Sequence, residues 1–257
     1  MSRTRALAWA LGLCLAAAAW PAAAITADEI IAHNVEARGG AAKLAGLTTL
    51  SRSGKLFIPG FNVELKTREL KARGGQYRQD VTLQGLTQVQ ATDGKQAWQV
   101  QPFQGRKDPA LMSADEAKAL MLSSDIDFPF VDYKKKGHTV DYLGKEDVDG
   151  TPAYGLHVQL KWGDEATFWI DPDTWMVIRE VDRQTVRGAE QISETDYGEY
   201  EQVQGVWVPM TEEQGAKDSD SAHKQKIVYD KAEGNAALAA SEFTVPATPA
   251  KPATEAK

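Results

Sequence analysis

The 257-residue chain contains a single cysteine, Cys14, and this cysteine lies inside an N-terminal leader. In the leader, Arg3 and Arg5 precede an apolar run over residues 6–19, and small residues follow in the sequence WPAAA. This order is typical of a secretory signal peptide, so we expect residues 1–24 to be cleaved off. The mature chain would then have no cysteine, which excludes disulfides and leaves a packed core as the source of stability.

The sequence also lacks a long hydrophobic run. The apolar run of the leader is shorter than the ~20 residues that a membrane-spanning helix needs, and no later segment is long enough either. Attachment of a lipid to Cys14 would call for a small residue before it, whereas Leu13 stands there. We therefore expect the mature chain to be exported, soluble and not lipidated.

Basic residues are fewer than acidic ones. The chain has 29 Lys and Arg against 36 Asp and Glu, for a formal net charge of −7. Loss of Arg3 and Arg5 with the leader would leave 27 basic and 36 acidic residues, or −9. Because an acidic surface repels phosphate groups, we expect no nucleic-acid partner.

Sequence motifs for catalysis and metal binding are missing as well. The four histidines are scattered, and none has a partner at metal-ligand spacing. The sequence has no Gly-x-Ser-x-Gly elbow, no His-Glu-x-x-His helix and no glycine-rich phosphate loop. We therefore expect no catalytic residue, no metal site and no cofactor, and we predict that the protein is not an enzyme.

An N-terminal helix is predicted from a capping box, in which a Thr is followed three residues later by Glu. Thr26 and Glu29 form this box, and Ile30 and Ile31 lie on the apolar face that follows. The pair Gly39-Gly40 then ends the helix, because glycine adopts the left-handed conformation found at helix ends. This helix needs another element to cover its apolar face.

A second helix is predicted in the middle of the chain. Ser113 and Glu116 form its capping box, and Leu120 and Met121 lie on its apolar face. It interrupts a chain that is otherwise rich in predicted strands.

Most of the remaining sequence alternates apolar and polar residues with the period of a β-strand, most clearly in YGLHVQLKW at residues 154–162. Short turns such as Asp93-Gly94 and Gly163-Asp164 join these segments. Consecutive strands joined in this way are antiparallel, and they bury one face by curling. We therefore predict a mainly β (α+β) fold, an open antiparallel β-barrel or half-barrel of about ten strands closed by the two helices.

The inward face of the predicted barrel carries apolar and aromatic side chains. These side chains either line a ligand cavity or fill the core of the barrel, and the alternation alone leaves both interpretations open. The residues assigned to this face are Trp98, Val100, Tyr154, Leu156, Val158, Leu160, Trp162, Phe168 and Ile170.

Three further segments resemble one known family. TDGKQAWQVQP at residues 92–102 is similar to a signature of the LolA-type periplasmic lipoprotein carriers, with a strand, an Asp-Gly-Lys turn, a Trp and a Pro at this spacing. EFTVP near the C-terminus resembles the Phe-Thr-x-Pro end of that family, and YEQVQGVWVP at residues 200–209 resembles a hairpin of the wider superfamily. The chain is therefore identified as a divergent member of the LolA-like superfamily.

The resemblance implies an open barrel whose concave apolar face holds acyl chains beneath a helical lid. The lid residues would be Ile30, Ile31, Leu120 and Met121, with Gly39 and Gly40 as a hinge. Arg73 matches the position of an arginine that latches the lid in the carriers, although Gly74 follows it where the family has proline. One domain is expected over residues 25–246, with a disordered Pro/Ala/Thr tail at residues 247–257.

The same resemblance implies a function. We expect a soluble periplasmic carrier that binds the acyl chains of a lipoprotein or lipid in an apolar cavity and transfers them toward the outer membrane. Its expected partners are those acyl chains and a membrane-bound donor or acceptor. The alternative is a non-enzymatic envelope sensor or interaction protein of the same fold that binds lipid or lipoprotein.

Overall fold

The computed structural model describes residues 24–61 and 63–246. Residues 1–23 of the predicted signal peptide (residues 1–24) and the predicted tail at residues 247–257 lie outside the described residues. The helices are α1 (Ala27–Ala37), α2 (Ala41–Gly46), α3 (Ala114–Ser123) and α4 (Tyr133–Lys136). The first strands are β1 (Thr49–Phe57), β2 (Glu64–Ala72), β3 (Gln76–Leu83), β4 (Leu86–Asp93), β5 (Ala97–Gln101) and β6 (Arg106–Leu111).

The strands of the second half follow α4. They are β7 (Thr139–Val148), β8 (Thr151–Gln159), β9 (Glu165–Ile170), β10 (Val177–Val186), β11 (Ala189–Gly198), β12 (Glu201–Val203), β13 (Val206–Val208), β14 (Thr211–Ala216) and β15 (Gln225–Gly234). Among the described residues, no helix is both long and apolar enough to span a membrane.

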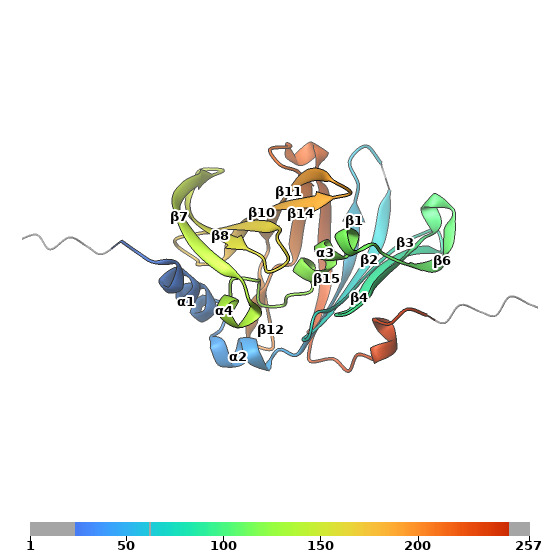
Figure 1. Cartoon of the computed structure of the whole chain (residues 1–257), viewed down its shortest axis with the longest axis horizontal. Helices are drawn as coiled ribbons and strands as arrows, with labels where there is room; N and C mark the ends of the chain where they lie inside the picture. Colours follow the sequence, from blue (N-terminus) through green and yellow to red (C-terminus); the bar gives the residue numbers. More distant parts are fainter. Residues whose placement is uncertain (1–23, 62, 247–257) are drawn as a thin grey trace, which may run out of the picture.

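One antiparallel sheet contains 13 of these strands, in the order β6-β5-β4-β3-β2-β1-β15-β14-β11-β10-β9-β8-β7, and β12 and β13 form a separate hairpin. The sheet is strongly curved but open, because β6 and β7 lie at opposite sides with α3 between them (Figure 1). The predicted mainly β, open antiparallel fold is therefore confirmed. The number of strands is larger than the ten or so predicted, because short and exposed strands such as β6 and β12 lack clear alternation.

The helix ends follow the predicted capping chemistry. Both capping boxes form, at the N-termini of α1 and α3. At the C-terminus of α1, the amides of Gly39 and Gly40 donate to the carbonyls of Glu36 and Val35, which is the hydrogen-bond pattern of a Schellman motif. Both glycines have positive φ, +124° for Gly39 and +90° for Gly40, which other residues rarely adopt.

The glycine pair also packs closely against the hairpin formed by β12 and β13. A Cβ on Gly39 would lie 2.2 Å from the carbonyl oxygen of Gly205, between the two strands of that hairpin. The pair thus forms a closely packed corner between α1 and α2, and its role as a hinge stays a prediction. An alanine at residue 39 would disturb this packing whether or not the corner moves.

The convex face of the sheet is covered by the end of the described chain. Trp98 donates from Nε1 to the carbonyl of Phe243 at 2.8 Å, and Phe243 packs with Leu70 and Ala72 of β2. Because this face is buried too, β2 and β5 carry apolar side chains on both sides, and β4 carries Val89 and Ala91 on the convex side. Period-two alternation therefore does not identify the concave face in this half of the sheet.

Candidate functional site

The concave side of β8 and β9 carries an apolar cluster. Leu156 lies opposite Phe168 in the sheet, Tyr154 lies opposite Ile170, and Val158 continues the same face. Leu156, Val158, Phe168 and Ile170 are all fully buried. These predicted residues therefore lie on the concave side in this half of the sheet, and their binding of acyl chains stays a prediction.

Side chains from outside the sheet cover this apolar cluster. Ile30 and Ile31 of α1 pack against it, together with Phe128 and Phe130 from the segment between α3 and α4. Phe130 stands edge-on to Phe168, with 5.1 Å between the ring centres, and Phe128 does the same at 5.7 Å. The cluster is therefore filled by the protein's own side chains in this conformation.

The other aromatic residues predicted in this half lie at the edge of the cluster. Tyr154 is half-buried and stacks on Trp175 at 5.3 Å. Leu160 and Trp162 follow the end of β8 rather than lying within it, and both pack against the cluster. Trp162 stands edge-on to His138.

Two of the predicted inward residues are on the wrong side of the sheet. Trp98 and Val100 pack with Val89 and Ala91 on the convex face, whereas their neighbour Gln90 lines the concave face. The prediction that Trp98 and Val100 line the cavity is therefore wrong. They are apolar because the C-terminal segment covers them.

The predicted lid residues divide into two groups. Ile30 and Ile31 cover the apolar cluster, while Leu120 packs with Tyr77 and Ala97 in the other half of the sheet. Met121 is half-buried and does not continue this face. Leu122 of α3, which was not predicted, joins the apolar cluster instead of Met121.

Arg73 holds the segment between α3 and α4, as the latch interpretation requires. Its guanidinium pairs with the carboxylate of Asp127 at 2.6 Å, donates to the carbonyl of Leu47 at 3.0 Å and also contacts the carbonyl of Leu44. These contacts join the end of β2 to α2 and to the segment that carries Phe128 and Phe130. Whether the contacts open and close stays a prediction.

A second arginine holds the same segment, and the sequence analysis did not single it out. Arg38 caps the C-terminus of α1 and is fully buried. It donates to the carbonyls of Asp127 at 2.9 Å and Ile126 at 3.2 Å, and its guanidinium lies over the ring of Phe128. The sequence feature that could have identified Arg38 is its position immediately before the glycine pair, on the helix face that points to the core.

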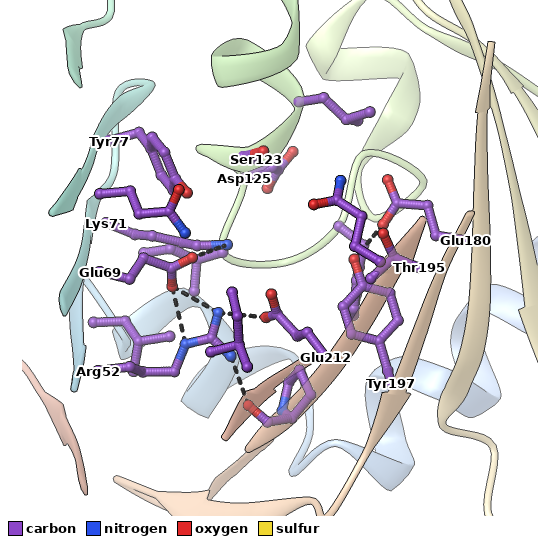
Figure 2. Close-up of a pocket in the computed structure, with 18 of the residues that line it drawn as sticks. Arg52, Glu69, Lys71, Tyr77, Ser123, Asp125, Glu180, Thr195, Tyr197 and Glu212 are labelled. Carbon is purple, nitrogen blue, oxygen red and sulfur yellow. Dashed lines mark hydrogen bonds and ion pairs between the residues drawn. The ribbon is translucent and has the colours of Figure 1, made fainter. Parts of the chain in front are cut away.

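The middle of the concave face is a polar cavity of about 230 Å³. Figure 2 shows Arg52, Glu69, Lys71 and Tyr77 on one side of it and Glu180, Thr195 and Tyr197 on the other, with Ser123 and Asp125 from α3 and its following segment nearby. The concave face is therefore apolar only in part, whereas the resemblance to the carriers implied an apolar concave face. Strands β1 and β2 place charged side chains on the same parity as apolar ones, and β10 and β14 add Glu180, Asp182 and Glu212 to the lining.

Arg52 organises one side of this cavity. Its buried guanidinium donates to Glu69 at 2.6 Å, to Glu212 at 2.7 Å and to the carbonyl of Pro209 at 2.6 Å. Although burial lowers the pKa of Arg52, the carboxylates of Glu69 and Glu212 raise it well above its ordinary value. The same pairing lowers the pKa of Glu69 against the effect of burial. This side is a fully charged network.

The opposite side carries two neighbouring carboxyl groups on β10. Glu180 and Asp182 are both buried, and Tyr197 donates its hydroxyl to Glu180. Burial raises the pKa of both groups, and the proximity of Glu180 raises the pKa of Asp182 further. Oδ1 of Asp182 has no hydrogen-bond partner among the described residues. Among the described residues that line the cavity, Asp182 is the one with a buried side-chain oxygen that has no hydrogen-bond partner.

No protein-family model matches the sequence, and no curated protein matches it. Solved structures do resemble it. A LolA superfamily protein from Nitrosomonas europaea has a TM-score of 0.54 at 14% identity and covers 86% of this chain and 98% of its own. A DUF1329 family protein from Desulfovibrio piger has a TM-score of 0.56 at 11% identity, with coverages of 85% and 97%.

A third solved structure gives a similar result. A domain from Vibrio parahaemolyticus, named for outer-membrane lipoprotein sorting, has a TM-score of 0.53 at 11% identity, with coverages of 84% and 97%. The chain has a LolA-like fold. This result confirms the resemblance to the LolA-like superfamily at the level of the fold, with the low identity of a divergent relative.

Proposed function

We propose that this protein is an exported periplasmic carrier that binds the acyl chains of a lipoprotein or lipid on the concave side of β8 and β9. The observation that carries the proposal is how the apolar cluster is covered. Ile30, Ile31, Phe128 and Phe130 fill it from segments that are held by side-chain contacts rather than by pairing in the sheet. Such segments can leave the cluster without breaking the sheet.

The free energy gained by burying an acyl chain in the apolar cluster is comparable to that gained by burying the covering side chains there. A bound chain of about a dozen methylenes gains roughly 10 kcal/mol by leaving water. Four large apolar side chains contribute about 6–12 kcal/mol when they are buried instead. Because these values are of the same order, the covering side chains can compete with cargo and drive its release to an acceptor.

A titration with a fluorescent acyl probe tests the proposal. Wild type should bind the probe, and Leu156→Glu should abolish binding because it places a carboxylate in the apolar cluster. His157→Ala is the matched control, since His157 lies between Leu156 and Val158 on the opposite face of β8. Circular dichroism should confirm that each variant is folded, because the buried carboxylate also costs stability.

Mass spectrometry of lipids extracted from protein purified without detergent provides a second readout. Acyl-bearing compounds should be recovered from wild type and from His157→Ala. If folded wild type neither binds the probe nor retains lipid, the cluster is an ordinary packed core and the carrier proposal is wrong. Lipid binding together with co-purification of a membrane partner would instead favour the alternative, a sensor or interaction protein of the same fold.

A further inference from the structure

The polar cavity next to the apolar cluster has the features of a binding site in its own right. It lies between the two halves of the curved sheet and beneath α3 (Figure 2). Gln214 of β14 and Gln225 of β15 line it, are paired in the sheet and are exposed, so the cavity reaches solvent at that end. A small polar molecule or group can therefore enter without removal of the apolar cover.

The two sides of the cavity differ in how their charges are matched. Around Arg52, the positive charges of Arg52 and Lys71 face the negative charges of Glu69 and Glu212. Asp125, at the cavity rim, pairs with Lys136 at 2.6 Å. Arg38 also lines the cavity and donates only to backbone carbonyls, so this part of the lining leaves no excess negative charge for a cationic ligand to neutralise.

The β10 side has no such balance. Glu180 accepts from Tyr197, and neither Glu180 nor Asp182 has an ion pair among the residues that the structure describes. Lys71 lowers the pKa of Glu180 from across the cavity but is paired with Glu69 at 3.8 Å, and Lys118 of α3 pairs with Asp164 at 3.7 Å. Asp182 is only 9% exposed, and its Oδ1 has no partner.

We propose that this cavity binds a primary ammonium group, with the carboxylates of Glu180 and Asp182 as its acceptors. An ammonium has three N–H donors and no acceptor, which complements a wall of carboxylate oxygens. Its positive charge also supplies the missing counter-ion of a buried acidic pair. A phosphate or a carboxylate would instead meet like charges on this wall.

A proton on the carboxyl pair would compete with the ammonium for the same oxygens. Burial favours the neutral form of a carboxyl group, and two adjacent carboxyls cannot both ionise easily. Burial raises the pKa of both Glu180 and Asp182, and Glu180 raises that of Asp182 further, so the pair holds a proton more readily than free carboxyl groups do. Binding of a cation should therefore displace that proton into solvent.

The ammonium can come from two sources, a free small amine or the headgroup of an amine-bearing lipid. The inference does not depend on the acyl-carrier proposal, because the cavity and the apolar cluster are lined mainly by different residues. A free amine tests the cavity alone. A lysolipid with the same amine tests both together.

Isothermal titration calorimetry at pH 7 in two buffers of different ionisation enthalpy tests the inference. The probes are ethanolamine, lysophosphatidylethanolamine and, as a headgroup without an amine, lysophosphatidylglycerol. At least one amine-bearing probe should bind with release of about one proton, and lysophosphatidylglycerol should release none. Binding of ethanolamine would identify a free amine as sufficient, and binding of the lysolipid alone would identify a headgroup.

Asp182→Asn is the decisive variant, because it keeps the shape of the side chain and removes its charge. It should weaken binding of the amine at least tenfold and abolish proton release. Glu180→Gln should act in the same direction, so the test does not depend on one variant being well folded. Glu213→Gln is the control, since Glu213 is next to Glu212 on β14 but pairs with Lys226 on the other face.

Two results would overturn the inference. One is that wild type binds neither amine-bearing probe, and the other is that both carboxyl variants bind and release protons as wild type does. If the acyl probe binds while ethanolamine and the lysolipid amine release no proton, the carrier proposal survives and this inference fails. If ethanolamine binds with proton release while the acyl probe does not bind, this inference survives and the carrier proposal fails.

Discussion

Arg52 and Asp182 are both buried in the same cavity, but they differ in the number of partners that their side chains have. The guanidinium of Arg52 has two carboxylates and a carbonyl as acceptors and lies 3.9 Å from the centre of the Tyr229 ring. A buried charge with this many partners is stable, and removal of one partner leaves the other uncompensated. Asp182 has no comparable partner, and its burial next to Glu180 raises its pKa well above the ordinary value.

The raised pKa of Asp182 predicts how stability depends on pH. A carboxyl whose pKa is higher in the folded state binds its proton more tightly there, so the contribution of Asp182 to wild-type stability should fall as pH rises above about 4. Asp182→Asn removes this loss. The difference in melting temperature between the variant and wild type should therefore grow in favour of the variant from pH 5 to pH 8, a window that lies above the usual carboxyl pKa of ~4. The slope is at most about 1.4 kcal/mol per pH unit for one proton.

Thermal unfolding followed by circular dichroism at several pH values measures this difference. Glu213→Gln, which removes a carboxylate from the outer face of β14, should run parallel to wild type. Parallel curves for Asp182→Asn and wild type would mean that Asp182 is ionised in the folded protein. The proton that the ammonium site requires would then be absent.

At the scale of elements, α1 is a short helix that is held at both ends. Its N-terminus is capped by Thr26, and its C-terminus ends in the Schellman motif next to Arg38. Between them, Asn34 donates to the carbonyl of Trp175 at 2.7 Å, and His33 stacks on the same tryptophan. Most of its packing energy comes from the apolar face, because isolated helices of this length are unstable.

Weakening this apolar face should strengthen cargo binding. The double substitution Ile30→Ala and Ile31→Ala removes part of the cover from the apolar cluster, at a cost of about 2–5 kcal/mol for each fully buried side chain. If α1 competes with cargo, the variant should bind the acyl probe at least tenfold more tightly than wild type. Its melting temperature should fall without probe and recover when probe is added.

Glu36→Ala provides the control on the same helix, because Glu36 is exposed and lies away from the cluster. It should bind the probe as wild type does. Weaker binding by the isoleucine variant would show that α1 forms part of the site rather than a competing cover. A competing cover predicts tighter binding of the acyl probe and a direct binding role predicts weaker binding, so the affinity of the isoleucine variant separates the two.

At the scale of the whole molecule, the sequence predicts the sheet and the helices better than the site. Alternation identified the inward face of β8 because the outer side of that strand is half polar, as at His157. It failed for Trp98, because the segment that covers the convex face is more than a hundred residues away in sequence. Asp182 could have been placed next to Glu180 by parity, but its lack of a partner depends on every element around the cavity.

The packed protein consists of a stable curved sheet and a cover that is attached at few points. The segment between α3 and α4 is held by Arg38 and Arg73 through Asp127, and by Lys136, which bonds Asp125 and the carbonyl of Phe128. These contacts are ion pairs and single hydrogen bonds, each of which contributes about 1–3 kcal/mol or less. The cover should therefore open well before the sheet unfolds.

Hydrogen exchange of the variant Asp127→Asn tests this separation. The substitution weakens the pair with Arg73, whose side chain is 35% exposed, but keeps the backbone carbonyl that Arg38 uses. Exchange should become faster in residues 124–133 and in α1, while β8, β9 and β10 keep wild-type protection. Asp132→Asn, which only breaks an exposed pair with Lys135, should leave both regions unchanged. Uniformly faster exchange across the sheet would show that cover and sheet unfold as one unit, and an acyl chain could then not enter without global unfolding.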